Sequence, residues 1–286
     1  MAHDVGRRTI DDFGEQWLSF RENPGYYGSP DLLADIFGPL FSIDKVAGLR
    51  VAEIGSGTGR IVNMLLEADA AHVYAVEPSA AMAVLRDNTA ARCDRVTCIE
   101  TAGDRLPAGL DLDLAVSIGV LHHIPAPEAV MRAAYAALRP GGYLLAWLYG
   151  REGNEAYLRV VAPLRRVTTR IPHRALMDVS RIACIALDAY IGLCRLAPLP
   201  MRAYMRDVLA KFPREVRVLT IYDQLNPAYA KYYTRQEAYD LFASAGFADV
   251  RLYHRHGYSW TVIGQKPDQE GTGSKRETVV LQPSQP

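Results

Sequence analysis

Three glycines at alternate positions follow an apolar segment that carries an acidic residue. The segment spans residues 51–60 and reads V-A-E-I-G-S-G-T-G-R, so that Gly55, Gly57 and Gly59 follow Glu53. Glycine has no Cβ and adopts positive φ without strain, so such a run lets a strand turn sharply into a helix while its backbone lies close to a ligand. The pattern predicts a pocket for a small molecule that carries a nucleoside.

The spacing of these glycines separates two classes of nucleotide enzyme. Dinucleotide-binding loops follow the pattern G-x-G-x-x-G, in which the third glycine comes three positions after the second. That position is occupied by Arg60 in this chain. A dinucleotide-dependent oxidoreductase is therefore the weaker alternative.

Other polar residues follow apolar segments that we expect to be strands. Glu77 ends the segment 73–77, about 20 residues after the loop, where a carboxylate can accept hydrogen bonds from both hydroxyls of a ribose. Asp104 follows the segment 96–100, and His122 and His123 follow the segment 112–118. Adjacent side chains point in different directions, so at most one of the two histidines faces a substrate.

Alternating strand-like and helix-like segments must position these residues. We expect strands near 50–54, 73–77, 96–100, 112–118, 142–148, 248–253 and 258–264, and helices near 59–68, 79–91, 126–138 and 234–245. Short apolar strands that alternate with helices form a parallel sheet covered on both faces, and ligands of such sheets bind at the carboxyl ends of the strands. The predicted fold class is α/β.

Several motifs occur in the order typical of one family. They are E-x-G-x-G-x-G at 53–59, S-I-G-V-L-H-H at 117–123 and L-R-P-G-G at 138–142. With them the chain resembles the class I S-adenosylmethionine-dependent methyltransferases, and in particular bacterial small-molecule and glycan methyltransferases with a GVLHH motif. The leader F-G-E-Q-W at 13–17 is similar to the F-G-x-Q-W leader of such enzymes. The resemblance implies S-adenosyl-L-methionine as cofactor, methyl transfer as activity, and a doubly wound Rossmann-like sheet of seven strands, mostly parallel, with the last antiparallel.

The resemblance also implies which residues contact the cofactor. In the family, the acidic position matched by Asp104 contacts the adenine amino group. The expected cofactor contacts are Glu53, Gly55, Ser56, Gly57, Thr58, Gly59, Glu77, Pro78, Met82, Gly103, Asp104, Arg105, Ser117, Ile118, Gly119 and His122.

An oxygen acceptor must lose its proton during methylation, and a histidine with a pKa near neutrality suits that task. The candidates for this base are His122 and His123, followed by His254 and His256 near the turn between the last two expected strands. The expected acceptor-side residues are Trp17, Tyr27, Tyr222, Asp223 and Asn226. We expect a small-molecule, glycan or lipid-linked amphiphilic acceptor, methylated on a hydroxyl. An amine or carbon acceptor, and a protein that binds the cofactor without catalysis, remain open.

The sequence does not favour a nucleic-acid partner. The formal net charge of zero argues against a nucleic-acid partner, which usually requires a basic excess. Segment 117–120 also lacks the Asn/Asp-Pro-Pro-aromatic clamp that the family uses on exocyclic amines of DNA. We expect no metal site.

The alternation of expected strands and helices stops after residue 150 and resumes at residue 234, which predicts how the chain is divided. Residues 49–150 and 234–266 are expected to form the methyltransferase core, with 1–48 as an N-terminal lid segment and 151–233 as a helical insertion over the acceptor. Thr234 is expected to cap the helix that follows it, with Glu237 three residues later, and Gly246 to end it. Residues 267–286 are rich in Gly, Ser, Gln and Pro, and are expected to form a disordered tail.

The insertion is basic. Between Arg151 and Arg217 the chain has thirteen Arg or Lys residues and six Asp or Glu residues. Charged residues at helical spacing between 174 and 195 occupy one stripe of a helix whose other side is apolar, and they exclude a membrane span. Three alternatives can bury that apolar side: the core, a second subunit of a homodimer, or a membrane interface with anionic headgroups.

The four cysteines, Cys93, Cys98, Cys184 and Cys194, show no C-x-x-C spacing. They are expected to be reduced thiols of a cytoplasmic protein. The first residues also lack the cationic and apolar regions of a signal peptide.

Overall fold

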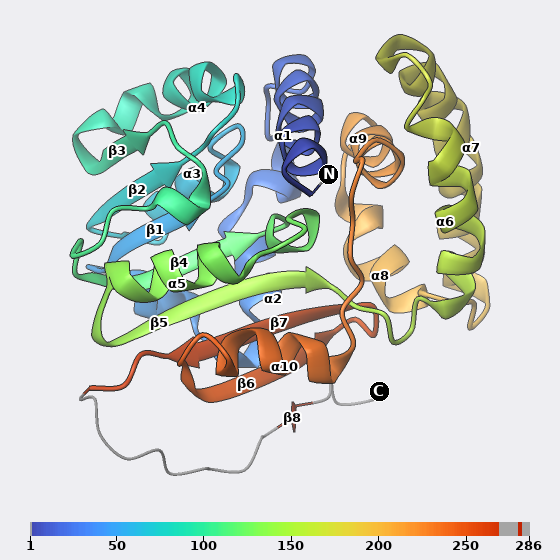
Figure 1. Cartoon of the computed structure of the whole chain (residues 1–286). Coiled ribbons are helices and arrows are strands. Elements are labelled where there is room, and N and C mark those ends of the chain that lie inside the picture. Colours follow the sequence, from blue (N-terminus) through green and yellow to red (C-terminus); the bar gives the residue numbers. More distant parts are fainter. Residues whose placement is uncertain (1, 269–279, 282–286) are drawn as a thin grey trace.

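A computed structural model describes residues 2–268 and 280–281 of this 286-residue chain (Figure 1). One sheet runs in the order β3-β2-β1-β4-β5-β7-β6-β8. Its strands are β1 (Arg50–Ile54), β2 (His72–Val76), β3 (Val96–Ile99), β4 (Leu112–Ile118), β5 (Leu138–Tyr149), β6 (Ala248–Arg255), β7 (Ser259–Gln265) and β8 (Val280–Leu281). Strands β1 to β5 pair in parallel, and β7 is antiparallel to both β5 and β6. Strands β1 to β7 confirm the predicted α/β fold with seven strands, and β8 is an addition to it.

Ten α-helices accompany the sheet in the described part of the chain. They are α1 (Ala2–Ser19), α2 (Pro30–Phe37), α3 (Arg60–Glu67), α4 (Ala81–Thr89), α5 (Glu128–Ala137), α6 (Glu155–Thr168), α7 (His173–Leu196), α8 (Arg202–Asp207), α9 (Arg214–Leu225) and α10 (Arg235–Ala243). Over the same residues, no helix has both the length and the apolarity needed to cross a membrane.

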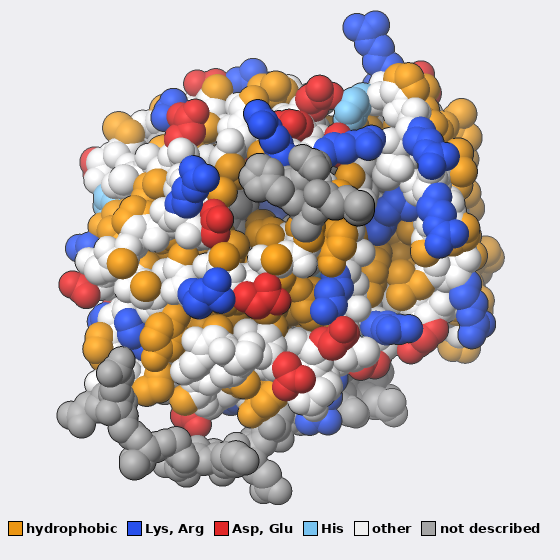
Figure 2. Space-filling view, viewed as in Figure 1, with side chains coloured by type: hydrophobic (Ala, Val, Ile, Leu, Met, Phe, Trp, Pro, Cys, Tyr) orange, Lys and Arg blue, Asp and Glu red, His pale blue; other side chains and the backbone are white. Residues whose placement is uncertain are grey.

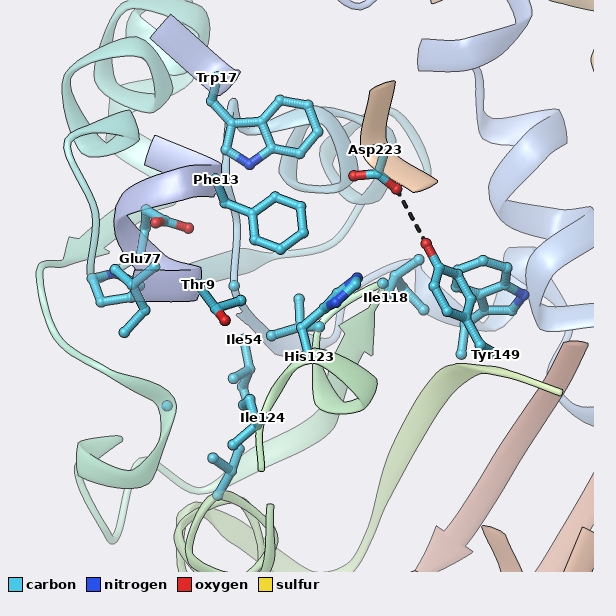
Figure 3. Close-up of a pocket in the computed structure, with 18 of the residues that line it drawn as sticks. Thr9, Phe13, Trp17, Ile54, Glu77, Ile118, His123, Ile124, Tyr149 and Asp223 are labelled. Carbon is cyan, nitrogen blue, oxygen red and sulfur yellow. Dashed lines mark hydrogen bonds between the residues drawn. The ribbon is translucent and has the colours of Figure 1, made fainter. Parts of the chain in front are cut away.

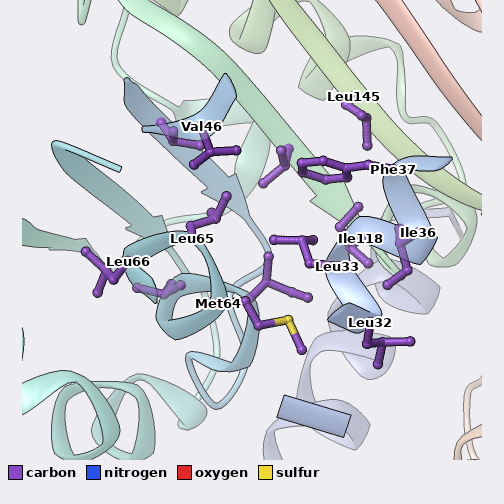
Figure 4. Packing of buried hydrophobic residues seen from close by; sticks show 14 of the residues in the cluster. Leu32, Leu33, Ile36, Phe37, Val46, Met64, Leu65, Leu66, Ile118 and Leu145 are labelled. Atoms are coloured by element: carbon purple, nitrogen blue, oxygen red, sulfur yellow. The ribbon is translucent and has the colours of Figure 1, made fainter. Parts of the chain in front are cut away.

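Two apolar clusters cover the two faces of the sheet. Helices α2, α3 and α4 contribute to one cluster, in which Leu33, Phe37 and Leu65 are fully buried (Figure 4). Helices α5 and α10 contribute to the other, and they lie in front of the sheet in Figure 1. Strands that are buried on both faces consist of near-continuous apolar runs, which explains why β1, β2 and β4 were recognisable in the sequence.

Helices α6 to α9 connect β5 to α10, and in Figure 1 α6 and α7 lie along one edge of the molecule while α9 lies between α1 and α7. Both α6 and α7 pack on α9. Ile191 and Cys194 of α7, with Met205 and Phe212 further along the chain, join the core cluster beneath α2. Part of the apolar surface of the insertion is therefore buried against the core.

The start of α10 is as expected and its end differs. The Thr234 hydroxyl accepts a hydrogen bond from the Glu237 backbone N–H, and the Glu237 carboxylate accepts one from the Thr234 N–H, which is a complete capping box. The helix ends at Ala243 with Ser244 as its C-cap. Gly246, the predicted cap, lies two residues further on at φ +93°, where it turns the chain toward β6.

The expected disordered tail, 267–286, falls mostly outside the described residues. Its described part includes the two-residue strand β8, which pairs in parallel with Leu252 and Tyr253 of β6. This strand was not expected.

Candidate functional site

The glycine run forms the turn between β1 and α3. Gly55, Gly57 and Gly59 have φ of +82°, +51° and +79°, values that favour glycine. The backbone N–H of Gly55 donates to the Val76 carbonyl, which ties the turn to the end of β2, and Gly59 is the N-cap of α3. The turn lies beside β4, at the point where the strand order reverses, and such a reversal leaves a crevice at the carboxyl ends of the strands.

The carboxylate of Glu77 lies at the tip of β2 and faces this crevice. One oxygen accepts from the Gly57 N–H at 2.8 Å, and the other accepts from the N–H and hydroxyl of Ser79. These bonds fix the orientation of the side chain, which is 6% exposed. The oxygen bonded to Gly57 has a second lone pair, so Glu77 can also accept a hydrogen bond from a ligand.

Glu53 is in a different environment. Its side chain is buried beneath the glycine turn, and its Oε2 atom has no hydrogen-bond partner among the described residues. Burial is the main cause that raises the pKa of this carboxyl to about 8. Glu53 is therefore protonated at neutral pH, and its side chain does not line the cavity described next.

A cavity of about 820 Å³ extends from the crevice beneath α1 and α9 (Figure 3). At one end its wall includes Glu77 and the turn Gly103–Arg105 after β3. At the other end the wall includes Tyr204, Phe212 and Arg255. The volume is within the range of pockets that hold small ligands.

His123 lies in the middle of this cavity. Figure 3 shows its imidazole between Phe13 of α1 and Tyr149 of β5, and the ring centroids of His123 and Phe13 are 4.8 Å apart. Its Nδ1 atom lies 2.8 Å from the Tyr229 carbonyl oxygen. A carbonyl can only accept, so Nδ1 carries the hydrogen and Nε2 of the neutral ring keeps its lone pair. Burial lowers the pKa of His123 and the charge of Asp223 partly offsets this, so the ring is neutral at pH 7.

His122 points into the protein. It is fully buried and stacks on Tyr149 with 3.7 Å between the ring centroids. Neither ring nitrogen has a partner among the described residues, and burial holds its pKa well below the usual range. The sequence left open which of the two histidines faces a substrate, and the structure places His123 at the cavity.

A polar network fixes Asp223 of α9 above His123. The Tyr149 hydroxyl donates to one carboxylate oxygen at 3.1 Å, and the Gln16 side-chain amide of α1 donates to the other at 3.1 Å. Gln224 in turn donates to the Tyr149 hydroxyl at 2.7 Å. Three elements that are far apart in the sequence therefore orient one carboxylate at the cavity wall.

Half of the expected cofactor residues line the cavity. Those that line it are Gly55, Glu77, Pro78, Gly103, Asp104, Arg105, Ile118 and Gly119. Those that do not are Glu53, Ser56, Gly57, Thr58, Gly59, Met82, Ser117 and His122. The second group shapes the turn or packs behind it; for example, a Cβ on Gly57 would lie 3.1 Å from the Trp17 indole nitrogen.

The acceptor-side candidates also divide. Trp17, Tyr27 and Asp223 line the cavity. Tyr222 and Asn226 do not. Tyr222 is buried in a cluster with Leu176 and Leu225, and Asn226 binds α1 through Asp12 and Gln16.

The two later histidines lie outside the cavity. His254 stacks on Trp260, with ring centroids 4.3 Å apart. His256 binds the Asp35 carboxylate at 2.9 Å, and the same carboxylate accepts from the buried guanidinium of Arg255. The residue between the two histidines, Arg255, lines the cavity instead. Adjacent side chains of a strand point to opposite faces. Which of residues 254 to 256 faces the cavity therefore depends on the register of β6, and the sequence did not specify that register.

Several residues of the cavity wall carried no recognisable signal in the sequence. They include Tyr149, Tyr204 and Arg255. The leader motif at 13–17 was noted, but only the packing of α1 against the strand tips shows that it forms a wall. Tyr149 is the last residue of β5, and its place at a strand's carboxyl end is the one cue that could have indicated it.

Part of the chain is similar in sequence to known methyltransferases. Residues 52–144 match a family model described as a methyltransferase domain. A ubiquinone biosynthesis O-methyltransferase of Idiomarina loihiensis is 30% identical over 123 residues, which is 42% of this chain and 50% of that protein. The chain thus spans about half the length of this curated relative.

Solved structures with a similar arrangement include two methyltransferases. Human N-acetylserotonin methyltransferase, solved in complex with SAM, has a TM-score of 0.47 and 13% identity, covering 79% of this chain and 49% of that one. A putative O-methyltransferase of Nostoc punctiforme has a TM-score of 0.48 and 16% identity, covering 83% and 55%.

The family match covers the strands and turns that build the cofactor end of the cavity, and strands β1 to β7 have the mostly parallel arrangement with an antiparallel last strand that the sequence predicted. Residues 52–144 of this chain are thus similar to a methyltransferase domain.

Proposed function

We propose that this protein transfers a methyl group from S-adenosyl-L-methionine to the hydroxyl of a small aromatic acceptor, with His123 as the general base. The observation that carries the proposal is one cavity that reaches both Glu77 and His123. The fixed Nδ1–H of His123 leaves Nε2 to accept a proton.

The residues at the cofactor end suit S-adenosylmethionine. Glu77 can accept from a ribose hydroxyl, and Asp104 also lines the cavity, where it can accept from an adenine amino group. Gly119 has φ +81°, and a Cβ there would meet no heavy atom within 4 Å, so the missing side chain leaves room in the cavity. Bound there, S-adenosylmethionine supplies a methyl group on a positively charged sulfur.

The remaining wall supports an aromatic acceptor. Aromatic side chains recur around it, and rings pack favourably against one another by edge-to-face or offset contacts. They are Phe13, Trp17, Tyr27, Trp147, Tyr149, Tyr204, Phe212 and Tyr258. The matched relative from Idiomarina loihiensis is an O-methyltransferase by name, which also favours an oxygen acceptor.

Side chains of the protein can take up the proton that the acceptor hydroxyl loses. A phenol has a pKa of about 10, so a neutral imidazole can remove its proton as the new bond to oxygen forms. The charge of Asp223 then stabilises the imidazolium, and Tyr149 and Gln16 hold Asp223 in place. The apolar walls exclude water and align the reactants, which is the main requirement of a displacement reaction.

The experiment measures release of S-adenosylhomocysteine from S-adenosylmethionine with a panel of phenols, sugars and amines. We expect turnover with phenols, and we expect His123→Ala to lower kcat by about 10²- to 10⁴-fold while cofactor affinity is retained. His254→Gln is the control, because His254 lies outside the cavity. Unchanged turnover by His123→Ala, or binding of S-adenosylhomocysteine without turnover on any acceptor, would refute the proposal.

We also propose a cytoplasmic location. The supporting observation is that all four cysteines are free thiols, as expected in a reducing compartment.

A further inference from the structure

The outward surface of α6 and α7 is apolar to an unusual degree. Nine large hydrophobic side chains are exposed in the described part of the chain, and eight belong to these two helices. They include Ile182, Ile185 and Leu196, which are 69%, 61% and 85% exposed. We call this surface the α6–α7 face, and it comprises Val160, Leu164, Val167, Val179, Ile182, Ile185, Leu193 and Leu196.

The spacing along α7 shows that this face is separate from the side that packs on the protein. Leu176, Ser180, Cys184, Ile191 and Cys194 recur every three to seven residues and are buried. Ile182, Ile185, Leu193 and Leu196 recur at similar spacing on the opposite side, and no described residue covers them. Exposed apolar side chains in this number on one side of a helix mark an interaction site.

Positive charge borders the α6–α7 face. Exposed arginines lie on both helices and in the connection between them, at Arg159, Arg166, Arg170, Arg174, Arg181 and Arg195. The exposed acidic residues of the same segment are Glu155 and Asp178, and Asp178 is paired with Arg181 at 2.9 Å. Figure 2 shows Lys and Arg side chains along the edge where Figure 1 draws α6 and α7, with hydrophobic side chains beside them.

Apolar side chains bordered by arginines favour an anionic bilayer over a second copy of the chain as the partner. In a symmetric dimer the same patch meets itself, so a self-contact through the α6–α7 face would bring its arginines against one another. A bilayer with anionic headgroups offers the complementary arrangement, because apolar side chains enter the interface while arginines meet the headgroups. The helices cannot cross the bilayer and would lie on its surface.

We infer that the α6–α7 face docks this protein on the surface of an anionic lipid bilayer. Helix α9, which packs against α6 and α7, forms part of the cavity wall through Leu219, Thr220 and Asp223. Docking therefore places the methyltransferase cavity one helix layer from the lipid. The inference is independent of the proposed reaction, because it concerns binding alone.

The test is flotation of the full chain with vesicles of phosphatidylcholine alone and of equal parts phosphatidylcholine and phosphatidylglycerol. We expect flotation with the second only, weakening as salt screens the charges. Arg166→Glu and Arg174→Glu should each weaken binding on the order of tenfold. Arg132→Glu, on the exposed side of α5, is the matched control and should bind as the natural protein does.

A second pair of variants tests the contribution of the apolar side chains of the α6–α7 face. Leu193→Glu should also weaken flotation on the order of tenfold, since a charge replaces a side chain that enters the interface. Leu18→Glu, at the one exposed large hydrophobic residue outside the face among those described, is its control. Both leucines are exposed, so we expect both variants to keep the melting temperature of the natural protein.

Three results would overturn the inference. The first is equal flotation with neutral and anionic vesicles, and the second is equal loss in test and control variants. The third is a lipid-free dimer in sedimentation that Leu193→Glu dissociates, which would assign the α6–α7 face to self-association.

Discussion

The tautomer of a single histidine links the structure to a reaction. His123 donates through Nδ1 to a carbonyl that is part of the segment between α9 and α10, so its other nitrogen is available as a base. Its neighbour His122 has the same residue type and a lower pKa, but it has no access to the cavity. Position relative to the cavity, more than basicity, distinguishes the two.

The pH dependence of turnover follows from this environment. Burial lowers the pKa of His123 below its usual 6.5, despite the opposing charge of Asp223. The neutral, active form therefore persists below pH 6.5, and kcat/KM should fall only as the pH drops through the lowered pKa. A pH profile of kcat/KM measures this directly, and an acidic limb centred above pH 6.5 would contradict it.

A matched pair of glycines tests the cofactor end of the cavity. Gly119 and Gly109 both have positive φ, of +81° and +69°, and a Cβ at either position meets no heavy atom within 4 Å. Only Gly119 lines the cavity. We expect Gly119→Val to weaken binding of S-adenosylhomocysteine in calorimetry by at least tenfold, and Gly109→Val, which carries the same backbone strain, to leave it unchanged. Equal affinities of the two variants would contradict the assignment.

At the scale of elements, the strands and turns of the methyltransferase domain could be predicted from sequence. Strands β1 and β4 are short apolar runs, and Gly55, Gly57 and Gly59 specify the turn because few other residues adopt their φ. The sequence could not predict which residues of the turn face the cavity. Ser56, Thr58 and Gly59 belong to the motif, yet they build the turn without lining the cavity.

The capping box of α10 offers a test of element stability. Thr234→Ala removes the hydroxyl that accepts from the Glu237 N–H, and it should lower the free energy of unfolding by about 1 kcal/mol in denaturant titration. Glu237→Gln is the control, because glutamine can also accept from the Thr234 N–H. A larger loss from the control than from Thr234→Ala would show that the box does not determine the stability of this helix end.

At the scale of the whole molecule, the cavity is assembled from remote segments. Phe13 of α1, Gly119 after β4, Asp223 of α9 and Arg255 of β6 all line it. No local pattern predicts such a meeting, because it depends on how α1 and the insertion pack over the strand tips. This is why the sequence indicated Glu77 and Gly119 but gave no sign of Tyr204 or Arg255.

A buried ion pair fixes the position of Arg255 in the cavity wall. Arg255 is 2% exposed and donates to Asp35 of α2, and Asp35 also binds His256. Burial by itself would raise the pKa of Asp35, but the bond from His256 and the charge of Arg255 lower it, so the carboxylate is ionised at neutral pH.

Asp35→Asn would leave the Arg255 charge buried without its partner. We expect a loss of about 3–5 kcal/mol in the free energy of unfolding, measured by denaturant titration at pH 7. Asp178→Asn, which breaks the exposed pair with Arg181, should change it by less than about 1 kcal/mol. Similar effects of the two substitutions would show that the buried pair is not a structural support of the cavity.

The most direct test of the central claim is a crystal structure of the full chain with S-adenosylhomocysteine. The account predicts the ribose hydroxyls at the Glu77 carboxylate, the adenine beside the turn Gly103–Arg105, and the sulfur directed toward His123. A ligand bound outside this cavity, or bound with its sulfur directed away from His123, would contradict the claim.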